Sequence, residues 1–387
     1  MFHGKYYGTR SNINDVALTY IRVDVSGLTT AYMLSKDADN KITVLAKRVS
    51  GDYDVEYASP WTCADYLPFG KEGSNQREWE RDSWPVLKEI AERFPEAVPI
   101  FLYLRLKCVL DSLIYQRKNQ GHAASDEISK AAQPYRWYAD VVPNKITIIR
   151  NAQFKPISQD KLPPDIDGVQ SFTSICINTA IYLSWLLGQS VKNGYIAQDA
   201  VAHHSGEKAD VVVNCTWLSS KFLLDVCDDK LYPDWGQIVI FRNDPGSIVS
   251  VSESETGDSD AKNEVTYIMT RTAGGVKVIG GSHHKHDWNA LPDPSLANRI
   301  LQSAIAICPQ LVKRGQGIEG LDIVRHGVGL RPVSDGGRQI EKDEVEGVSV
   351  VHNYGHGGFG YQSSFGCAAK AISLVEEVLS NKRQVGL

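Results

Sequence analysis

The sequence contains no long apolar run and no apolar core near its start, and each absence excludes a class of protein. The apolar stretch from Val98 to Leu104 is followed at once by Arg105 and Lys107. It therefore falls short of the roughly 18 to 20 apolar residues that a membrane span requires. Residues 1–14 are polar and lack the apolar centre of a signal peptide. We expect no transmembrane helix and no membrane partner.

The sequence also lacks a basic stripe and closely spaced cysteine pairs. Its formal net charge is -5 and its pI is about 6.1, which argues against a nucleic-acid partner. The seven cysteines are an odd number, widely spaced and without a C-x-x-C pair, so neither a disulfide framework nor a zinc site is indicated. Small-molecule chemistry in a reducing compartment fits this composition best.

The chain is long enough to bury a large core. Its 387 residues are 42% hydrophobic and 22% charged, which is typical of a soluble globular protein with two packed domains or one interrupted domain. The opening pattern is a strand over Ala17–Val25, a helix over Leu28–Ser35 and a strand over Lys41–Ala46. Nucleotide-binding α/β folds begin in this way.

Later segments extend this pattern and then interrupt it. A helix is predicted over Thr179–Lys192, and a buried strand over Lys208–Asn214 belongs with the opening unit. A helix over Glu78–Phe94 contains Pro85, which must lie in its first turns or kink it.

The segments Val265–Arg271 and Val276–Ile279 alternate as an antiparallel hairpin, which indicates a central insertion. The segment from Gly246 to Lys262, rich in Ser, Glu and Asp, is predicted to be a mobile loop.

The segment from Val350 to Ala368 is the most informative part of the chain. An apolar strand leads into a loop with glycines at 355, 357, 358 and 360, and a helical pattern follows. Glycines let a backbone approach a ligand closely, and a helix start offers free N–H groups, so the pattern indicates a cofactor-approach loop. An ordinary glycine-rich turn is the alternative for the glycines alone.

The residues around these glycines carry a family resemblance. The run His352-Asn-Tyr-Gly-His-Gly-Gly-Phe-Gly360, followed by Gly366-Cys-Ala368, resembles the signature of the D-amino-acid oxidase family, FAD enzymes that include D-aspartate oxidase. The resemblance extends from about Val25 to Val378, and its other strong matches include Ala58-Ser-Pro-Trp61 and Gly327-Val-Gly-Leu-Arg-Pro332.

The resemblance implies the fold class and the domain division. We expect an α/β protein in which a Rossmann-like FAD-binding domain is interrupted by a substrate domain with a mainly antiparallel sheet. Residues 15–70, 160–235 and 310–380 are expected to form the FAD-binding domain, and residues 75–155 and 236–309 the substrate domain.

Three residues are candidates for the catalytic site. Arg331 lies at a predicted strand end, where a guanidinium can fork a carboxylate; in isolation it would be a surface arginine in an ion pair. Tyr267 lies within a strand, where a packed core tyrosine is the alternative. By resemblance, both would hold the substrate carboxylate, with His283 near the side chain or amine. The cluster from His283 to His286 would suit an acidic side chain or form a solvated turn, and a metal site is less favoured.

The resemblance implies oxidative deamination of D-amino acids, with FAD as cofactor and O2 as acceptor. The products would be an imino acid, which hydrolyses to a 2-oxo acid, and hydrogen peroxide. Neutral D-amino acids are slightly preferred over D-aspartate, and D-aspartate oxidase is the alternative. Family members are often dimeric and peroxisomal, although this chain ends Gln384-Val-Gly-Leu387 rather than Ser-Lys-Leu; a cytoplasmic protein is the alternative. The residues expected to line FAD are Ser26, Gly27, Ala46, Lys47, Ser59, Gly357, Gly358, Gly360, Tyr361 and Gln362.

The phosphate fingerprint at the start of the fold is degraded. A G-x-G-x-x-G motif needs three glycines, but Arg22 and Asp24 replace the first two and only Gly27 is kept. An aspartate facing a pyrophosphate adds like-charge repulsion. Further departures from the family pattern occur at Thr62, Cys63, Trp217, Asp234 and Trp235. Either the chain is a diverged protein with weak or no FAD binding, or residues before about Val25 come from a mistaken gene model while the locus encodes an ordinary enzyme.

Overall fold

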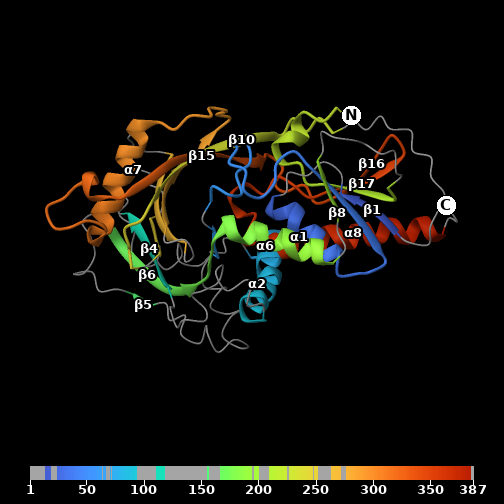
Figure 1. The fold of residues 1–387 in the computed structure, drawn as a ribbon, viewed down its shortest axis with the longest axis horizontal. Coiled ribbons are helices and arrows are strands. Elements are labelled where there is room, and N and C mark those ends of the chain that lie inside the picture. The colour runs from blue at the N-terminus through green and yellow to red at the C-terminus, as the bar shows by residue number, and fades with distance from the viewer. Residues whose placement is uncertain are drawn as a thin grey trace.

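The computed structural model describes two large sheets, the helices that cover them and one small two-stranded sheet. The described residues are 14–18, 24–62, 64–66, 70, 72–93, 110–117, 155–156, 166–193, 196–199, 209–224, 226–246, 248–251, 263–271 and 276–384. Within these ranges, no helix is both long and apolar enough to cross a lipid bilayer. Figure 1 shows one sheet with its helices on the right and the other sheet on the left.

In the described part of the chain, six strands form the first sheet, in the order β16-β17-β9-β1-β2-β8. All neighbours are parallel except β16 and β17. The fully buried β9 lies between β17 and β1, as an apolar strand of a parallel sheet should. The strands are β1 (Asn14–Leu18), β2 (Asn40–Ala46), β8 (Ile196–Asp199), β9 (Val211–Asn214), β16 (Lys342–Val345) and β17 (Val348–His352).

Among the described residues, four helices accompany the first sheet and enclose its core. They are α1 (Val25–Leu34), α2 (Asn75–Arg93), α6 (Thr179–Lys192) and α8 (Ser364–Gln384). Leu28, Tyr182 and Val351 are fully buried in one apolar cluster that joins α1, α6 and β17. The predicted helix over Thr179–Lys192 is confirmed, and Pro85 lies inside α2.

The start of the fold differs from the expected strand over Ala17–Val25. β1 ends at Leu18, and Val25 is already the first residue of α1. Asp24 accounts for the start of α1 at Val25, because it forms the N-cap of this helix. Its backbone is extended, and its side chain accepts a hydrogen bond from the Gly27 N–H.

The second sheet has nine strands among the described residues. Their order is β14-β10-β13-β12-β11-β4-β6-β5, and β15 pairs with the other edge of β10. Most neighbours are antiparallel, which confirms the expected mainly antiparallel sheet. The strands are β4 (Leu110–Arg117), β5 (Lys155–Pro156), β6 (Ile166–Ser174), β10 (Leu231–Phe241), β11 (Ile248–Val251), β12 (Glu264–Thr270), β13 (Lys277–Ser282), β14 (His284–Lys285) and β15 (Ile323–Ser334).

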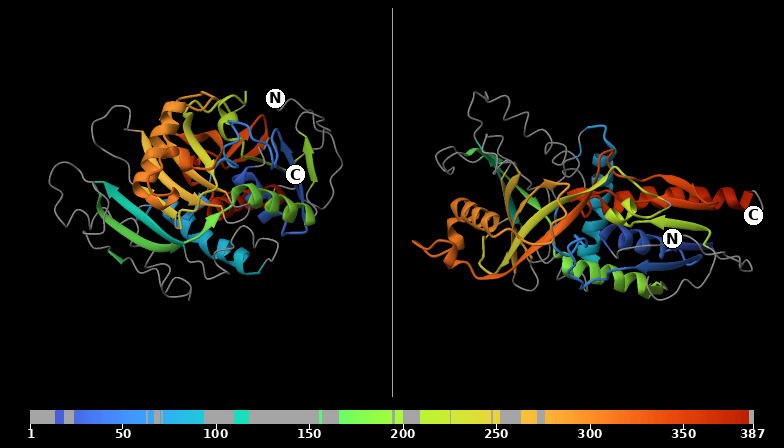
Figure 2. Two further views of the ribbon diagram at one scale, coloured as in Figure 1. Left: turned by 60° about the vertical axis from the view of Figure 1, so that its left-hand side comes forward. Right: turned by 90° about the horizontal axis from the view of Figure 1, so that it is seen from above.

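One face of the second sheet is covered by α7 (Pro294–Ile307), which packs Ile300 and Leu301 against Val239 and Ile268. Figure 2 shows α7 on the outer side of this sheet. The described residues also include two short strands and several 3-10 turns. They are β3 (Ala64–Asp65), β7 (Cys176–Ile177) and the 3-10 turns η3 (Trp217–Lys221), η4 (Pro309–Leu311), η5 (Ile318–Gly320) and η6 (Gly357–Phe359).

The predicted hairpin is confirmed, since β12 and β13 are antiparallel neighbours. The expected loop from Gly246 to Lys262 is wrong in part, because β11 extends the sheet there; residues 252–262 lie outside the described residues.

Three elements belong with a different sheet from the one that the expected domain segments imply. β6 and β15 belong to the nine-stranded sheet, although their residues were expected in the FAD-binding domain. Helix α2, expected in the substrate domain, packs on α8, where Ser83 accepts a hydrogen bond from the Gly366 N–H. A strand or helix pattern does not specify its distant partner, so these assignments required the structure.

Candidate active site

One face of the second sheet brings the predicted substrate residues together, and we call it the site face. The register pairs Tyr267 of β12 with Gly280 of β13, and Asp234 of β10 with Arg331 of β15. Alternate residues of a strand share a face, so Asp234, Gly236 and Ile238 lie on the same side of β10. The register between β10 and β13 places Tyr267 on that side as well.

Glycines make the floor of the site face. A Cβ atom at Gly236 would overlap the guanidinium of Arg331, and one at Gly280 would overlap the ring and hydroxyl of Tyr267. Arg331 therefore extends from β15 over β10, while Tyr267 extends from β12 over β13. The two side chains reach across the same pair of strands from opposite sides.

The guanidinium of Arg331 is held by only one of its nitrogens. Nη1 donates to the carbonyl oxygen of Ser282 at 2.9 Å and to Oδ2 of Asp234 at 3.3 Å, with a longer contact of 3.5 Å to the Asp234 carbonyl. Among the described residues, Nε and Nη2 have no hydrogen-bond partner. This leaves the edge of the guanidinium that can fork a carboxylate available for a ligand.

Asp234 contacts both Arg331 and His283, a position that sequence reasoning did not predict. Its Oδ2 lies 2.6 Å from Nδ1 of His283 as well as 3.3 Å from Arg331. Burial acts to raise the pKa of Asp234, but the hydrogen bond from His283 and the charges of Arg331 and His283 lower it below its ordinary value. Asp234 is therefore ionised at neutral pH. The sequence signal was the departure from the family pattern before Gly236.

His283 contacts Asp234, and its Nδ1 also lies 3.5 Å from Nη1 of Arg331, whereas the other histidines of its cluster point elsewhere. The ring of His284 lies against Trp235, and the ring of His286 lies 4.3 Å from that of Tyr232. The cluster thus forms no convergent cationic pocket on the described residues.

Trp61 forms an aromatic wall beside Arg331. Its ring occupies the space above Gly327, which lies on the same face of β15 as Arg331. Its Nε1 donates to the Asp54 carbonyl, and the guanidinium of Arg325 lies 5.0 Å from its centroid. Trp61 is thereby fixed at the edge of the site.

The glycine loop lies directly against this site. Gly355 and Gly357 have φ of +81° and +56°, which explains why glycine is required at both positions. A Cβ at Gly358 would lie 3.9 Å from Cδ of Arg331, and His356 forms a backbone bridge with Val333 of β15. The loop that was predicted to approach a cofactor therefore borders the predicted substrate arginine.

The other side of the loop meets the start of α1. A Cβ at Gly360 would lie 3.4 Å from Val25, and the Tyr361 hydroxyl donates to the Ser59 carbonyl at 3.0 Å. The Val25 N–H donates to Oγ of Ser59 at 3.4 Å. Segments from three distant parts of the chain thus meet at one place.

Comparison with known proteins agrees with this arrangement. The profile of a family described as FAD dependent oxidoreductase matches residues 25–374. A D-amino-acid oxidase of Fusarium vanettenii is 38% identical over 373 residues, which cover 93% of this chain and 97% of that protein. The chain belongs to the D-amino-acid oxidase family of FAD-dependent oxidoreductases.

Other members and neighbours are more distant. A D-aspartate oxidase of Cryptococcus neoformans is 27% identical over 407 residues, covering 92% of this chain and 95% of that protein. The structure of glycine oxidase from Bacillus cereus superposes with a TM-score of 0.67 at 17% identity, covering 94% of this chain and 98% of that chain. At this identity the likeness shows the fold, which confirms the expected α/β architecture of the family.

The residues expected to hold FAD, the family's cofactor, fit that group at the glycine loop and less well at the start of α1. At the loop end they fit, because Ser59, Gly360 and Tyr361 meet beside the start of α1, and Ser26 and Gly27 are buried in its first turn. Ala46 ends β2 at the same edge of the parallel sheet, with the exposed Lys47 next to it. Gln362 differs in orientation, since its amide donates to Glu80 of α2 at 2.7 Å.

The N-terminal end of α1 fits the cofactor less well. Asp24 is fully buried, and its carboxylate accepts the Gly27 N–H at 2.7 Å. A helix start of this kind normally binds the pyrophosphate of a dinucleotide, so Asp24 places a negative charge where an anion should bind. Arg22 and Cys63 lie outside the described residues.

The remaining departures have structural roles. The Thr62 carbonyl accepts hydrogen bonds from Arg271 and from the Thr179 hydroxyl, each at 2.7 Å. Trp217 is buried with a φ of +54° at the start of η3.

Burial, reinforced by the charge of Arg338, lowers the pKa of His356 in the glycine loop to about 3, which keeps its ring neutral.

Proposed function

We propose that this family member oxidises D-amino acids by holding the substrate carboxylate between Arg331 and Tyr267. The observation that carries the proposal is the open Nε–Nη2 edge of Arg331 beside Gly358 of the cofactor loop. A carboxylate forked by this edge keeps the α-carbon of the substrate next to the loop.

The contribution of the chain is mainly positioning. Arg331 supplies a charge-assisted fork, and the Tyr267 hydroxyl lies on the opposite side of the glycine floor to donate a further hydrogen bond. Ser59 and the glycine loop would help to hold FAD, which would supply the acceptor for hydride from the α-carbon of an amino acid whose amine is neutral. No acid-base side chain of the protein is required for such a step. An L-amino acid anchored at the same carboxylate would direct its α-hydrogen away from the cofactor.

We further propose neutral D-amino acids, rather than D-aspartate, as the preferred substrates. Asp234 supports this preference, because its ionised carboxylate already lies beside Arg331. The alternative of a D-aspartate oxidase finds support in the Cryptococcus neoformans relative. Hydrogen peroxide as product, a homodimer and peroxisomal localisation remain predictions from the family.

The second candidate function is a catalytically silent member of the fold, which Asp24 at the start of α1 favours. Purified full-length protein should be incubated with FAD, and oxygen consumption should be measured with D-alanine, D-aspartate and L-alanine. We expect consumption with D-alanine that exceeds the rate with D-aspartate, and none with L-alanine. A colourless protein that shows no change in flavin absorbance with added FAD would establish the silent alternative.

A further inference from the structure

Asp234 occupies a position that a substrate-binding arginine does not require, and its contacts suggest a specific role. The carboxylate lies in β10 directly opposite Arg331 of β15. Its residue is only 7% exposed, so its charge is poorly screened by water. A buried carboxylate is costly unless charged partners and hydrogen bonds compensate it. His283 and Arg331 provide those partners through a single oxygen, Oδ2.

The contacts of Asp234 restrict the orientation of the guanidinium. Ser282 and Asp234 both bind Nη1, and Gly236 lies beneath the guanidinium. With Nη1 engaged by both residues, the Nε–Nη2 edge keeps no hydrogen-bond partner among the described residues. The second carboxylate oxygen, Oδ1, is buried and has no hydrogen-bond partner among the described residues.

The charge balance of the site follows from these contacts. Next to the carboxylate-binding edge, the ionised carboxylate of Asp234 offsets the charge of the Arg331 guanidinium before a substrate binds, and His283 contacts the same carboxylate. An α-carboxylate can still bind the free edge of Arg331. A second carboxylate on the substrate would be repelled by the carboxylate of Asp234. The positive charge of Arg331 would not fully offset this repulsion, because Arg331 already pairs with Asp234.

We propose that Asp234 is the positioning and specificity-determining residue of the substrate site. It orients Arg331 for a single carboxylate and disfavours ligands with two. The inference rests on the proposed function for its substrates, but it makes a claim about carboxylate binding that can be measured without turnover.

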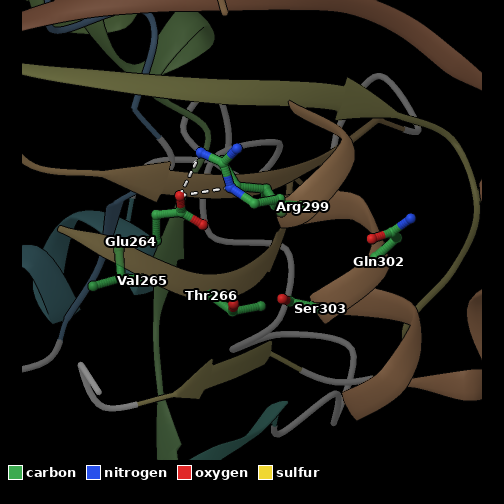
Figure 3. Close-up of a pocket in the computed structure, with 7 residues that line it drawn as sticks. Glu264, Val265, Thr266, Arg299, Gln302 and Ser303 are labelled. Carbon is green, nitrogen blue, oxygen red and sulfur yellow. Dashed lines mark hydrogen bonds and ion pairs between the residues drawn. The ribbon is translucent and has the colours of Figure 1, made fainter. Parts of the chain in front are cut away.

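The test compares Asp234→Asn, Asp234→Ala and a matched control in the FAD-incubated full-length chain. The control is Glu264→Gln, which removes a carboxylate of the same sheet that is ion-paired with Arg299. Figure 3 shows this pair beside a pocket lined by residues of β12 and α7, the helix that packs against Val239 and Ile268 on the opposite face of the sheet from Tyr267. Glu264 is therefore a paired carboxylate outside the substrate site.

Steady-state kinetics give the first readout. For Asp234→Ala we expect the KM for D-alanine to rise about tenfold, with kcat changed less than about threefold, because the binding geometry is lost rather than a reacting group. Asp234→Asn keeps an oxygen that can accept a hydrogen bond from Arg331, so its KM for D-alanine should lie closer to the wild-type value than to that of Asp234→Ala. In both variants the ratio of kcat/KM for D-alanine to that for D-aspartate should fall about tenfold, and Glu264→Gln should change neither quantity.

Calorimetric binding of propanoate and succinate gives the second readout. The wild type should bind propanoate more tightly than succinate, and Asp234→Asn should reduce this preference about tenfold, which corresponds to about 1.4 kcal/mol. An unchanged preference in Asp234→Asn would overturn the inference, even if Asp234→Ala fails to fold. If the wild type shows the binding preference but oxidises no D-amino acid, the proposed function fails while the role of Asp234 stands.

Discussion

Replacing Gly236 by alanine should disable the carboxylate clamp without unfolding the protein. A Cβ at this position would overlap Nη2, Cζ and Nη1 of Arg331, all at the far end of a flexible side chain. The guanidinium can move away at little cost to the fold. The displaced guanidinium cannot keep its contacts to Asp234 and Ser282 while also presenting its Nε–Nη2 edge to a substrate.

The magnitude follows from the hydrogen bonds that the displaced guanidinium would lose. A hydrogen bond to a charged group contributes about 1.5 to 3 kcal/mol. Loss of one such bond to the substrate carboxylate, about 2 kcal/mol, lowers kcat/KM for D-alanine about 30-fold. The assay is oxygen consumption at varied D-alanine, with thermal unfolding measured in parallel.

Gly329 provides the matched control, because it lies opposite Gly236 in the neighbouring strand. A Cβ there would lie 3.5 Å from the nearest atoms of Trp61, which is ordinary van der Waals contact. Gly329→Ala should keep kcat/KM within about threefold of the wild type. If Gly236→Ala behaves like Gly329→Ala, the reasoning about the position of Arg331 is refuted.

Three further predictions concern the hydroxyl of Tyr267, the start of α1 and the glycine loop. Tyr267→Phe should lower kcat/KM for D-alanine about tenfold, which corresponds to one hydrogen bond to a carboxylate; unchanged steady-state kinetics would remove Tyr267 from the site. Asp24→Gly should tighten FAD binding about tenfold in a flavin-fluorescence titration, because it removes a charge that repels the pyrophosphate, while a glycine N-cap costs only a few tenths of a kcal/mol; weaker binding would contradict this. The lowered pKa of His356, about 3 against an ordinary 6.5, means that the unfolded chain binds the proton first as pH falls. Its stabilising effect is complete above about pH 6.5 and is lost toward pH 3, so the free energy of unfolding should fall by about 2 kcal/mol between pH 7 and 5 through this residue. His356→Gln should remove this decrease when the free energy of unfolding is measured in urea between pH 7 and 5. An unchanged pH dependence in the variant would contradict the role given to His356.

Local patterns predicted much of the fold, because they depend on neighbouring residues. The helix over Thr179–Lys192, the hairpin of β12 and β13 and the glycine loop all follow from periodicity and glycine positions. The end of the first strand did not, since Asp24 acts as an N-cap rather than as part of a strand.

The composition of the site could be predicted only in part. Motifs indicated Arg331 and Tyr267, but their convergence depends on the register of four strands. That register also places Asp234 beside Arg331, which no local pattern specifies. For the same reason the sequence could not show that the amide of Gln362 turns toward Glu80.

The central claim is that this chain holds a D-amino acid carboxylate on Arg331 next to its FAD. The most direct test is anaerobic addition of D-alanine and, separately, L-alanine to the FAD-loaded protein while its visible absorbance is recorded. Our account predicts that D-alanine bleaches the flavin band, that L-alanine does not, and that Arg331→Met slows the bleaching more than 100-fold at low substrate concentration, on the order of two lost charge-assisted hydrogen bonds. Equal bleaching by both enantiomers, or bleaching unaffected by Arg331→Met, would contradict it.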